Sequence, residues 1–101
     1  RIGPGEIEDC MLKHPAVAQA AAVGSPDELR GEIVKAFIVL AQDHAPSDAL
    51  RQDIQDAVRH NLAAYEYPRE IEFVSELPMT TTGKVRRIEL RQLERDKKGR
   101  S

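Results

Sequence analysis

The sequence predicts an α+β domain, in which helices pack on a small sheet of about three strands. Two apolar stretches of strand length, 17–23 and 33–40, come before a helix with one apolar face and a short alternating segment at 70–74. The expected order is helix, strand, strand, helix, strand, helix. The 101 residues fit a single domain with one modest core.

The first expected element is a helix over 6–13. Ile7, Cys10 and Met11 share one face through their i, i+3, i+4 spacing, and Pro15 ends the helix. Cys10 is expected to be a small core residue, because nothing near it in the sequence would activate a thiol. A single cysteine also excludes an internal disulfide and a cysteine-based zinc site.

The two apolar stretches are expected to pair as a hairpin. Residues 24–31 between them contain two glycines and a proline, which predict a long, exposed connection. Because both strands are almost continuously apolar, we expect both faces of the sheet to be covered.

Ser47 is expected to cap a second helix that runs to about residue 63. Its apolar stripe consists of Leu50, Ile54, Ala57, Val58 and Leu62. Arg59 lies about 140° from the centre of this stripe, counting roughly 100° per residue, so its side chain should face solvent or a ligand.

The chain is expected to end in a basic helix over 86–96 and a flexible tail over about 97–101. Residues 84–100 hold eight basic and three acidic side chains, a net charge of +5 in a chain whose net charge is −2 at pH 7. This charge split suggests an anionic partner, although charge alone favours the simpler interpretation of a solvated terminal helix. Aromatic residues make up only 4%, so a surface that stacks nucleic-acid bases is poorly supplied.

The stretch best suited to chemistry is Thr80-Thr81-Thr82-Gly83-Lys84. It is not a Walker A loop, because Pro78 stands where the first glycine is required and Val85 stands where serine or threonine is required. A lysine on such a loop can neutralise charge that develops on a phosphoryl or carboxylate oxygen, and a plain surface lysine is the alternative. The histidines lack metal-ligand spacing and no serine lies in a nucleophile elbow, so no metal site is expected and the rest of any active site must lie elsewhere.

Three longer stretches carry a family resemblance. The chain starts with Arg1-Ile2-Gly3-Pro4-Gly5-Glu6-Ile7-Glu8, continues with Ser25-Pro26-Asp27-Glu28-Leu29-Arg30-Gly31-Glu32-Ile33-Val34-Lys35-Ala36-Phe37 and later has Leu77-Pro78-Met79-Thr80-Thr81-Thr82-Gly83-Lys84-Val85-Arg86-Arg87. In this order and spacing they resemble the C-terminal domain of the adenylate-forming acyl-CoA synthetases, nearest to the medium-chain and acetyl-CoA synthetase branches. The resemblance covers almost the whole chain, so residues 1–101 are expected to be one domain of a longer protein.

The resemblance implies an ATP-dependent, AMP-forming ligase. Such enzymes activate a carboxylic acid, here expected to be a short- or medium-chain fatty acid, as an acyl-adenylate and then transfer the acyl group to CoA. A large N-terminal domain, the implied partner of this one, would hold ATP, Mg²⁺ and the acid, so the chain alone should be inactive. The small domain would rotate between the two half-reactions. A cytoplasmic location is expected, and the longest apolar runs are too short to span a membrane.

The resemblance also implies roles for five residues. Lys84 matches the lysine that contacts ATP and carboxylate oxygens, and Arg1 matches an arginine that contacts the nucleotide phosphates. Arg30, Arg59 and Tyr67 match positions that meet CoA, and the planar arginine fork suits phosphate groups. Acetylation would remove the charge of Lys84, which makes a lysine acetyltransferase and a deacetylase candidate partners.

The sequence departs from the family at two positions, and two alternatives stay open. Glu66 stands where the family usually has lysine, and Met79 replaces a lysine before the threonines. One alternative is an adenylation domain that loads the pantetheine of a carrier protein. The other is a non-enzymatic module that binds an anionic partner, such as nucleic acid, through residues 84–100; steep salt dependence of DNA binding would support it.

Overall fold

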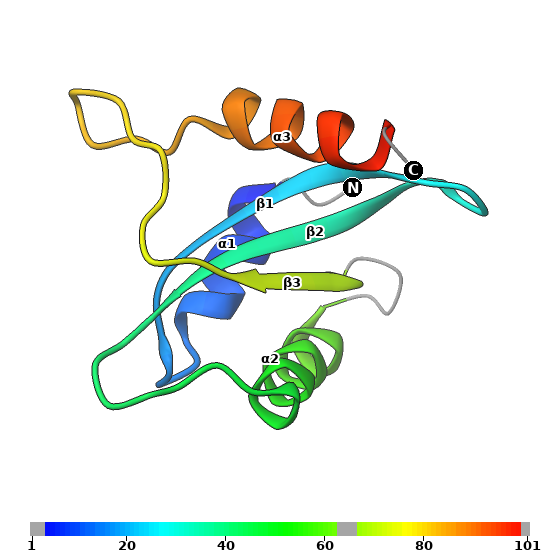
Figure 1. The fold of residues 1–101 in the computed structure, drawn as a ribbon. Helices are drawn as coiled ribbons and strands as arrows, with labels where there is room; N and C mark the ends of the chain where they lie inside the picture. Colours follow the sequence, from blue (N-terminus) through cyan, green and yellow to red (C-terminus); the bar gives the residue numbers. More distant parts are fainter. Residues whose placement is uncertain (1–3, 63–66, 100–101) are drawn as a thin grey trace.

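The chain folds as a three-stranded sheet between two layers of helices. The structure, a computed structural model, describes residues 4–62 and 67–99. Its elements are α1 (Pro4–Leu12), β1 (Val17–Asp27), β2 (Gly31–Leu40), α2 (Asp48–Asn61), β3 (Glu70–Phe73) and α3 (Arg87–Gly99). The helix α3 covers one face of the sheet, and α1 and α2 lie against the other (Figure 1). The predicted α+β class and element order are confirmed.

The strand order is β1-β2-β3. The first two strands pair antiparallel from Val17↔Leu40 to Asp27↔Gly31, and β3 joins β2 in parallel, so α2 serves as the crossover. The predicted long connection in the hairpin is wrong, because the pairing extends through most of residues 24–31. Only three residues make the turn.

A side chain and a glycine explain this tight turn. The backbone N–H groups of Leu29 and Arg30 donate to the Asp27 carboxylate, at 3.2 and 2.9 Å. Gly31 has a φ of 78°, which favours glycine. Pro26 can lie inside β1 because this strand is at the edge of the sheet.

The core has two parts, one on each face of the sheet, as the apolar strands predict. The part under α1 and α2 includes Cys10, Ile38, Ile54 and Val58, all buried. The part under α3 is smaller and consists of Ala21, Val23, Phe37, Leu77 and Leu90. The prediction that Cys10 is a core residue is confirmed.

The helix α2 follows its sequence pattern closely. The Ser47 side chain accepts a hydrogen bond from the Leu50 N–H at 3.0 Å, which caps the helix as predicted. Ile54 and Val58 of the stripe are fully buried, and Arg59 on the opposite side is exposed, as predicted.

The helix α3 is longer than the sequence predicts. It continues past Asp96 to Gly99, so Lys97 and Lys98 are helical residues and not part of a tail. Their ammonium groups pair with carboxylates of β3, at 3.0 Å to Glu72 and 2.8 Å to Glu70. These ion pairs hold the last turn of the helix against the sheet.

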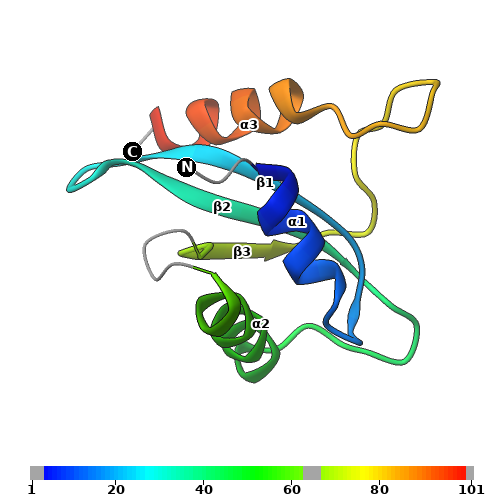
Figure 2. The ribbon, with the colours of Figure 1, turned by 180° about the vertical axis from the view of Figure 1, so that it is seen from behind.

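The loop between β3 and α3 and the turn between β1 and β2 lie at opposite ends of the molecule. Both views show this separation (Figures 1 and 2). The start of β3 is at the same end as the β1–β2 turn. None of the described helices is long and apolar enough to cross a bilayer.

Candidate functional site

The lysine loop, residues 80–84, is a tight turn stabilised by its own threonines. The Thr80 N–H donates to the Lys84 carbonyl at 2.7 Å, and the Gly83 N–H donates to the Thr80 carbonyl at 3.0 Å. The Thr80 hydroxyl accepts from the Lys84 N–H at 3.1 Å and lies 2.9 Å from the Thr82 hydroxyl. Gly83 has a φ of 85°, so glycine is needed there. The hydroxyls of Thr80 and Thr82 therefore help to shape the loop.

A short stem connects this loop to the body of the domain. Met79 and Val85 form an isolated antiparallel bridge, and the Arg86 N–H donates to the Pro78 carbonyl at 2.8 Å. Val85 packs against the core under α3. Lys84 is exposed, and within the described part of the chain no carboxylate pairs with its ammonium group. The ammonium group is therefore available to an anion outside the domain.

The opposite end of the molecule carries a cluster of one tyrosine and two arginines. The Arg59 guanidinium lies 4.9 Å from the centroid of the Tyr67 ring, and that of Arg69 lies 5.2 Å from it. Tyr67 is half-buried and packs against the core, whereas both arginines are exposed. Cation–π contacts of this kind restrict the guanidinium groups while leaving their N–H donors free. The structure thus brings Arg59 and Tyr67 together and adds Arg69, which the sequence analysis did not select.

Of the other predicted site residues, one is described and one is not. Arg30 is exposed in the β1–β2 turn, at the same end as this cluster. Arg1 lies outside the described residues, as does Glu66. The nucleotide-binding role of Arg1 therefore stays a prediction.

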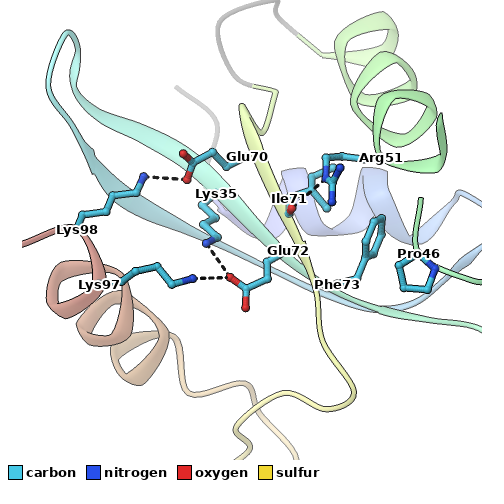
Figure 3. Close-up of a pocket in the computed structure, with 9 residues that line it drawn as sticks. All are labelled: Lys35, Pro46, Arg51, Glu70, Ile71, Glu72, Phe73, Lys97 and Lys98. Atoms are coloured by element: carbon cyan, nitrogen blue, oxygen red, sulfur yellow. Dashed lines mark hydrogen bonds and ion pairs between the residues drawn. The ribbon is translucent and has the colours of Figure 1, made fainter. Parts of the chain in front are cut away.

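Between the sheet and α3 lies an ion cluster around the buried Lys35 and Glu94, which also includes the partly exposed Glu72, the exposed Lys97 and the hydroxyl of Ser25. The Lys35 ammonium group lies 2.8 Å from the Glu94 carboxylate and 2.9 Å from that of Glu72. The Ser25 hydroxyl donates to Glu94 at 2.9 Å, and the Glu94 side chain is only 1% exposed. Figure 3 shows Lys35 and Lys97 converging on Glu72 beside an open pocket.

The ion cluster shifts the pKa values of two of its members. Burial alone would lower the pKa of Lys35, but its hydrogen bonds to Glu94 and Glu72 outweigh burial and raise the pKa above its ordinary 10.5. Burial alone would raise the pKa of Glu72, but Lys35 and Lys97 outweigh it and lower the pKa below its ordinary 4.5. Both charges are thus stabilised by folding.

These pKa shifts predict how the free energy of unfolding depends on pH, with losses at both acidic and basic pH. The contribution of Glu72 is complete above pH 4.5 and is lost as pH falls through its lowered folded pKa. The contribution of Lys35 is complete below pH 10.5 and is lost as pH rises through its raised folded pKa. Urea unfolding of the chain across this pH range measures the free energy of unfolding. With Glu72→Gln, this free energy should fall less steeply as the pH decreases below 4.5. The control Glu28→Gln, at an exposed turn residue, should keep the slope of the unmodified chain; equal slopes for both variants would contradict the assignment.

Residues 4–62 and 67–99 contain no group of three His, Cys, Asp or Glu side chains that is arranged to hold a metal ion.

Comparison with known proteins identifies the family. The family model of the AMP-binding enzyme C-terminal domain matches residues 6–84. The chain belongs to this family. The human mitochondrial acyl-coenzyme A synthetase ACSM1 is 54% identical to this AMP-binding enzyme C-terminal domain over 96 residues, which are 93% of the chain and 17% of that protein. The 4-hydroxybutyrate–CoA ligase 1 of Metallosphaera sedula is 50% identical over 98 residues, which are 97% of the chain and 17% of that protein.

Solved structures of the same class superpose closely on this AMP-binding enzyme C-terminal domain. The acyl-CoA synthetase of Brucella canis gives a TM-score of 0.93 with 48% identity over 97% of the chain and 18% of that structure. The anthranilate CoA ligase AuaEII, in complex with anthranoyl-AMP, gives 0.91 with 43% identity over 97% of the chain and 19% of that structure. The predicted family and fold are confirmed, and the chain spans less than a fifth of these relatives.

Proposed function

We propose that this domain belongs to an ATP-dependent, AMP-forming acid–thiol ligase, which activates a carboxylic acid as an acyl-adenylate and passes the acyl group to CoA. The observation that carries the proposal is the placement of the cations. An unpaired lysine lies on a loop at one end of the domain, and exposed arginines lie at the other end. Rotation of the domain would present these ends in turn to one active site, as two half-reactions require. The four relatives named above are acyl-CoA synthetases or CoA ligases, which supports the same reaction.

The large N-terminal domain of the whole protein would be the main partner, and it would bind ATP, Mg²⁺ and the acid. We propose a short- or medium-chain fatty acid as the substrate, as the resemblance of the sequence motifs implies. In the adenylation step, the Lys84 ammonium group would stabilise charge that develops on the phosphate oxygens, with Arg1 on the nucleotide phosphates. Acetylation of Lys84 by a lysine acetyltransferase would remove this charge, and a deacetylase would restore it. A cytoplasmic location belongs to the same proposal.

In the thioester step, the arginine end would meet the phosphate groups of CoA. Arg59 and Arg30 would provide the charge. Tyr67 has a different role in this proposal: its ring, 4.9 Å from Arg59, would hold the guanidinium group in place.

Replacing Arg59 with alanine in the full-length enzyme should raise the KM for CoA about 10- to 100-fold, which corresponds to a lost charge-assisted contact of about 1.5–3 kcal/mol. Acyl-adenylate formation should change little, because Arg59 faces the site only in the second step. The measurement compares pyrophosphate release without CoA and thioester formation across CoA concentrations. Arg91→Ala, at an exposed arginine of α3, is the matched control and should leave both unchanged. A parallel loss of pyrophosphate release in Arg59→Ala would contradict the assignment.

The two alternatives are less well supported. Several cations of residues 84–100 are already neutralised, because Arg87, Lys97 and Lys98 pair with carboxylates of the domain itself. This reduces the charge available to nucleic acid. The carrier-protein alternative is tested with the full-length enzyme by offering free CoA or a carrier protein as the acyl acceptor.

A further inference from the structure

We propose that Glu8 and Arg87 form a clamp that positions Lys84 for the adenylation step. This inference rests on the proposed function of Lys84, and it gives a role to two residues that do not themselves reach the reacting groups. Both are positioning residues. The proposal stands on their contacts with three elements of the fold.

The first observation is the number of bonds that hold the Glu8 carboxylate. It accepts a hydrogen bond from the Ala22 backbone N–H at 2.8 Å and one from the Arg87 Nε–H at 2.8 Å. The second arginine donor reaches its other oxygen, so the pair is bidentate. The Glu8 side chain is only 10% exposed. The carboxylate of α1 is therefore fixed to edge strand β1 and to the first residue of α3 at once.

The second observation is that these elements lie on different faces of the sheet. The helix α1 packs on one face and α3 on the other (Figures 1 and 2). The carboxylate thus joins the two layers across the edge of β1. Because Ala22 anchors it to the strand backbone, Glu8 cannot follow Arg87 if the start of α3 shifts. The start of α3 is thereby held at one point.

The third observation is the short path from Arg87 to the lysine loop. Arg87 follows Lys84 by three residues, and the stem between them is a ladder closed by Arg86 on Pro78 and by the Met79–Val85 bridge. The segment on the other side of the loop, residues 74–78, has no regular secondary structure. Leu77 anchors that segment in the core under α3, so the direction of the stem depends on this buried contact and on the residues that start α3. The hydrogen bond from Arg87 to Glu8 outweighs burial and raises the pKa of Arg87, so the guanidinium group of the clamp stays charged.

The test is a double-mutant cycle in the full-length enzyme with Arg87→Met, Lys84→Ala and both together. Arg87→Met should slow acyl-adenylate formation, measured as pyrophosphate release without CoA, about 10- to 100-fold, since a displacement near 1 Å can cost that much. The double variant should form acyl-adenylate almost as fast as Lys84→Ala alone, because a clamp that acts through the ammonium group has no effect once that group is removed. Thioester formation from pre-made acyl-adenylate and CoA should change less than about 2-fold. Arg87→Lys should recover part of the loss, since it keeps the charge without the bidentate fork.

Two further variants keep the test decisive. Glu89→Gln breaks the exposed pair, 3.6 Å apart, between Arg86, which precedes α3, and Glu89 in the first turn of α3, and should leave adenylation unchanged. If Arg87→Met lowers the unfolding temperature too far, Glu8→Gln replaces it, because glutamine keeps an acceptor for the Ala22 N–H and removes the charge and one of the two acceptors of the Arg87 fork. It should slow adenylation in the same direction and again add little to Lys84→Ala.

Two results would overturn the clamp. Losses that multiply in the double variant, or that fall equally on both half-reactions, would show that Arg87 acts on overall stability and not through Lys84. Full adenylation activity in Lys84→Ala alone would overturn the proposed role of the lysine itself, and the clamp with it. The rate of acyl-adenylate formation in Lys84→Ala alone therefore shows whether the proposed function has failed or only the clamp.

Discussion

Replacing Lys35 with methionine should destabilise the purified chain by about 3–5 kcal/mol, because the change removes the nearest cation of a buried carboxylate and leaves only Lys97 and Lys98, at 3.9 and 4.0 Å from it. The Glu94 side chain is 1% exposed, and Lys35 is its partner at 2.8 Å. Removing one member of a buried pair costs far more than an exposed pair contributes. Urea unfolding followed by circular dichroism at neutral pH measures the loss.

Two further variants test whether the loss in Lys35→Met comes from the buried carboxylate. Lys13→Met, at an exposed lysine, should change the free energy of unfolding by less than about 0.5 kcal/mol. Adding Glu94→Gln to Lys35→Met should recover most of the loss, since the buried charge is gone and glutamine still accepts from the Ser25 hydroxyl. A loss in Lys35→Met no larger than in Lys13→Met would mean that the ion cluster does not hold α3 on the sheet.

The sequence predicts most of this fold because its local patterns agree with the tertiary packing. The stripe that contains Ile54 and Val58 matches the buried face of α2, and the apolar run at 17–23 serves both parts of the core by alternation. The hairpin connection is the exception. Glycine and proline there predict a loop, but strand pairing and the Asp27 carboxylate extend the strands almost to the turn.

The ion cluster was missed for a different reason. Lys35 lies 37 residues from Glu72 and 59 from Glu94, so no local spacing connects them. The register of β2 against β3 and the docking of α3 bring them together. The available signal was a single lysine inside the apolar run at 33–40.

The sequence predicts which residues form the candidate site better than it predicts the contacts between them. The exposed position of Arg59 follows from helical periodicity, and the lysine loop is recognisable from its threonines and glycine. The stacking of Arg59 on Tyr67 depends on how the segment before β3 returns to α2, which the sequence does not encode locally. Glu8 and Arg87 are 79 positions apart, so no local pattern in the sequence predicts their contact.

Replacing Lys84 with alanine in the full-length enzyme should slow acyl-adenylate formation about 10²- to 10³-fold, the usual cost of losing one group that stabilises developing charge. The ammonium group is exposed on a rigid loop and has no partner within the described residues, so it is ready to meet phosphate oxygens as the carboxylate attacks. Pyrophosphate release in the absence of CoA measures this step. Thioester formation from pre-made acyl-adenylate and CoA should stay near the normal rate, because rotation would have carried the loop away.

Comparing the two half-reactions distinguishes a catalytic lysine from a structural one. Lys84→Gln, which resembles the acetylated side chain in lacking charge, should give a similar selective loss, whereas Lys13→Ala should leave both steps unchanged. Thermal unfolding of the Lys84 variants should match that of the parent enzyme, because the exposed ammonium group pairs with no carboxylate among residues 4–62 and 67–99. Equal loss in both half-reactions would mean that Lys84 acts throughout the reaction or supports the structure. The opposite ends of this domain would then have no separate roles, and the rotation account would have to be abandoned.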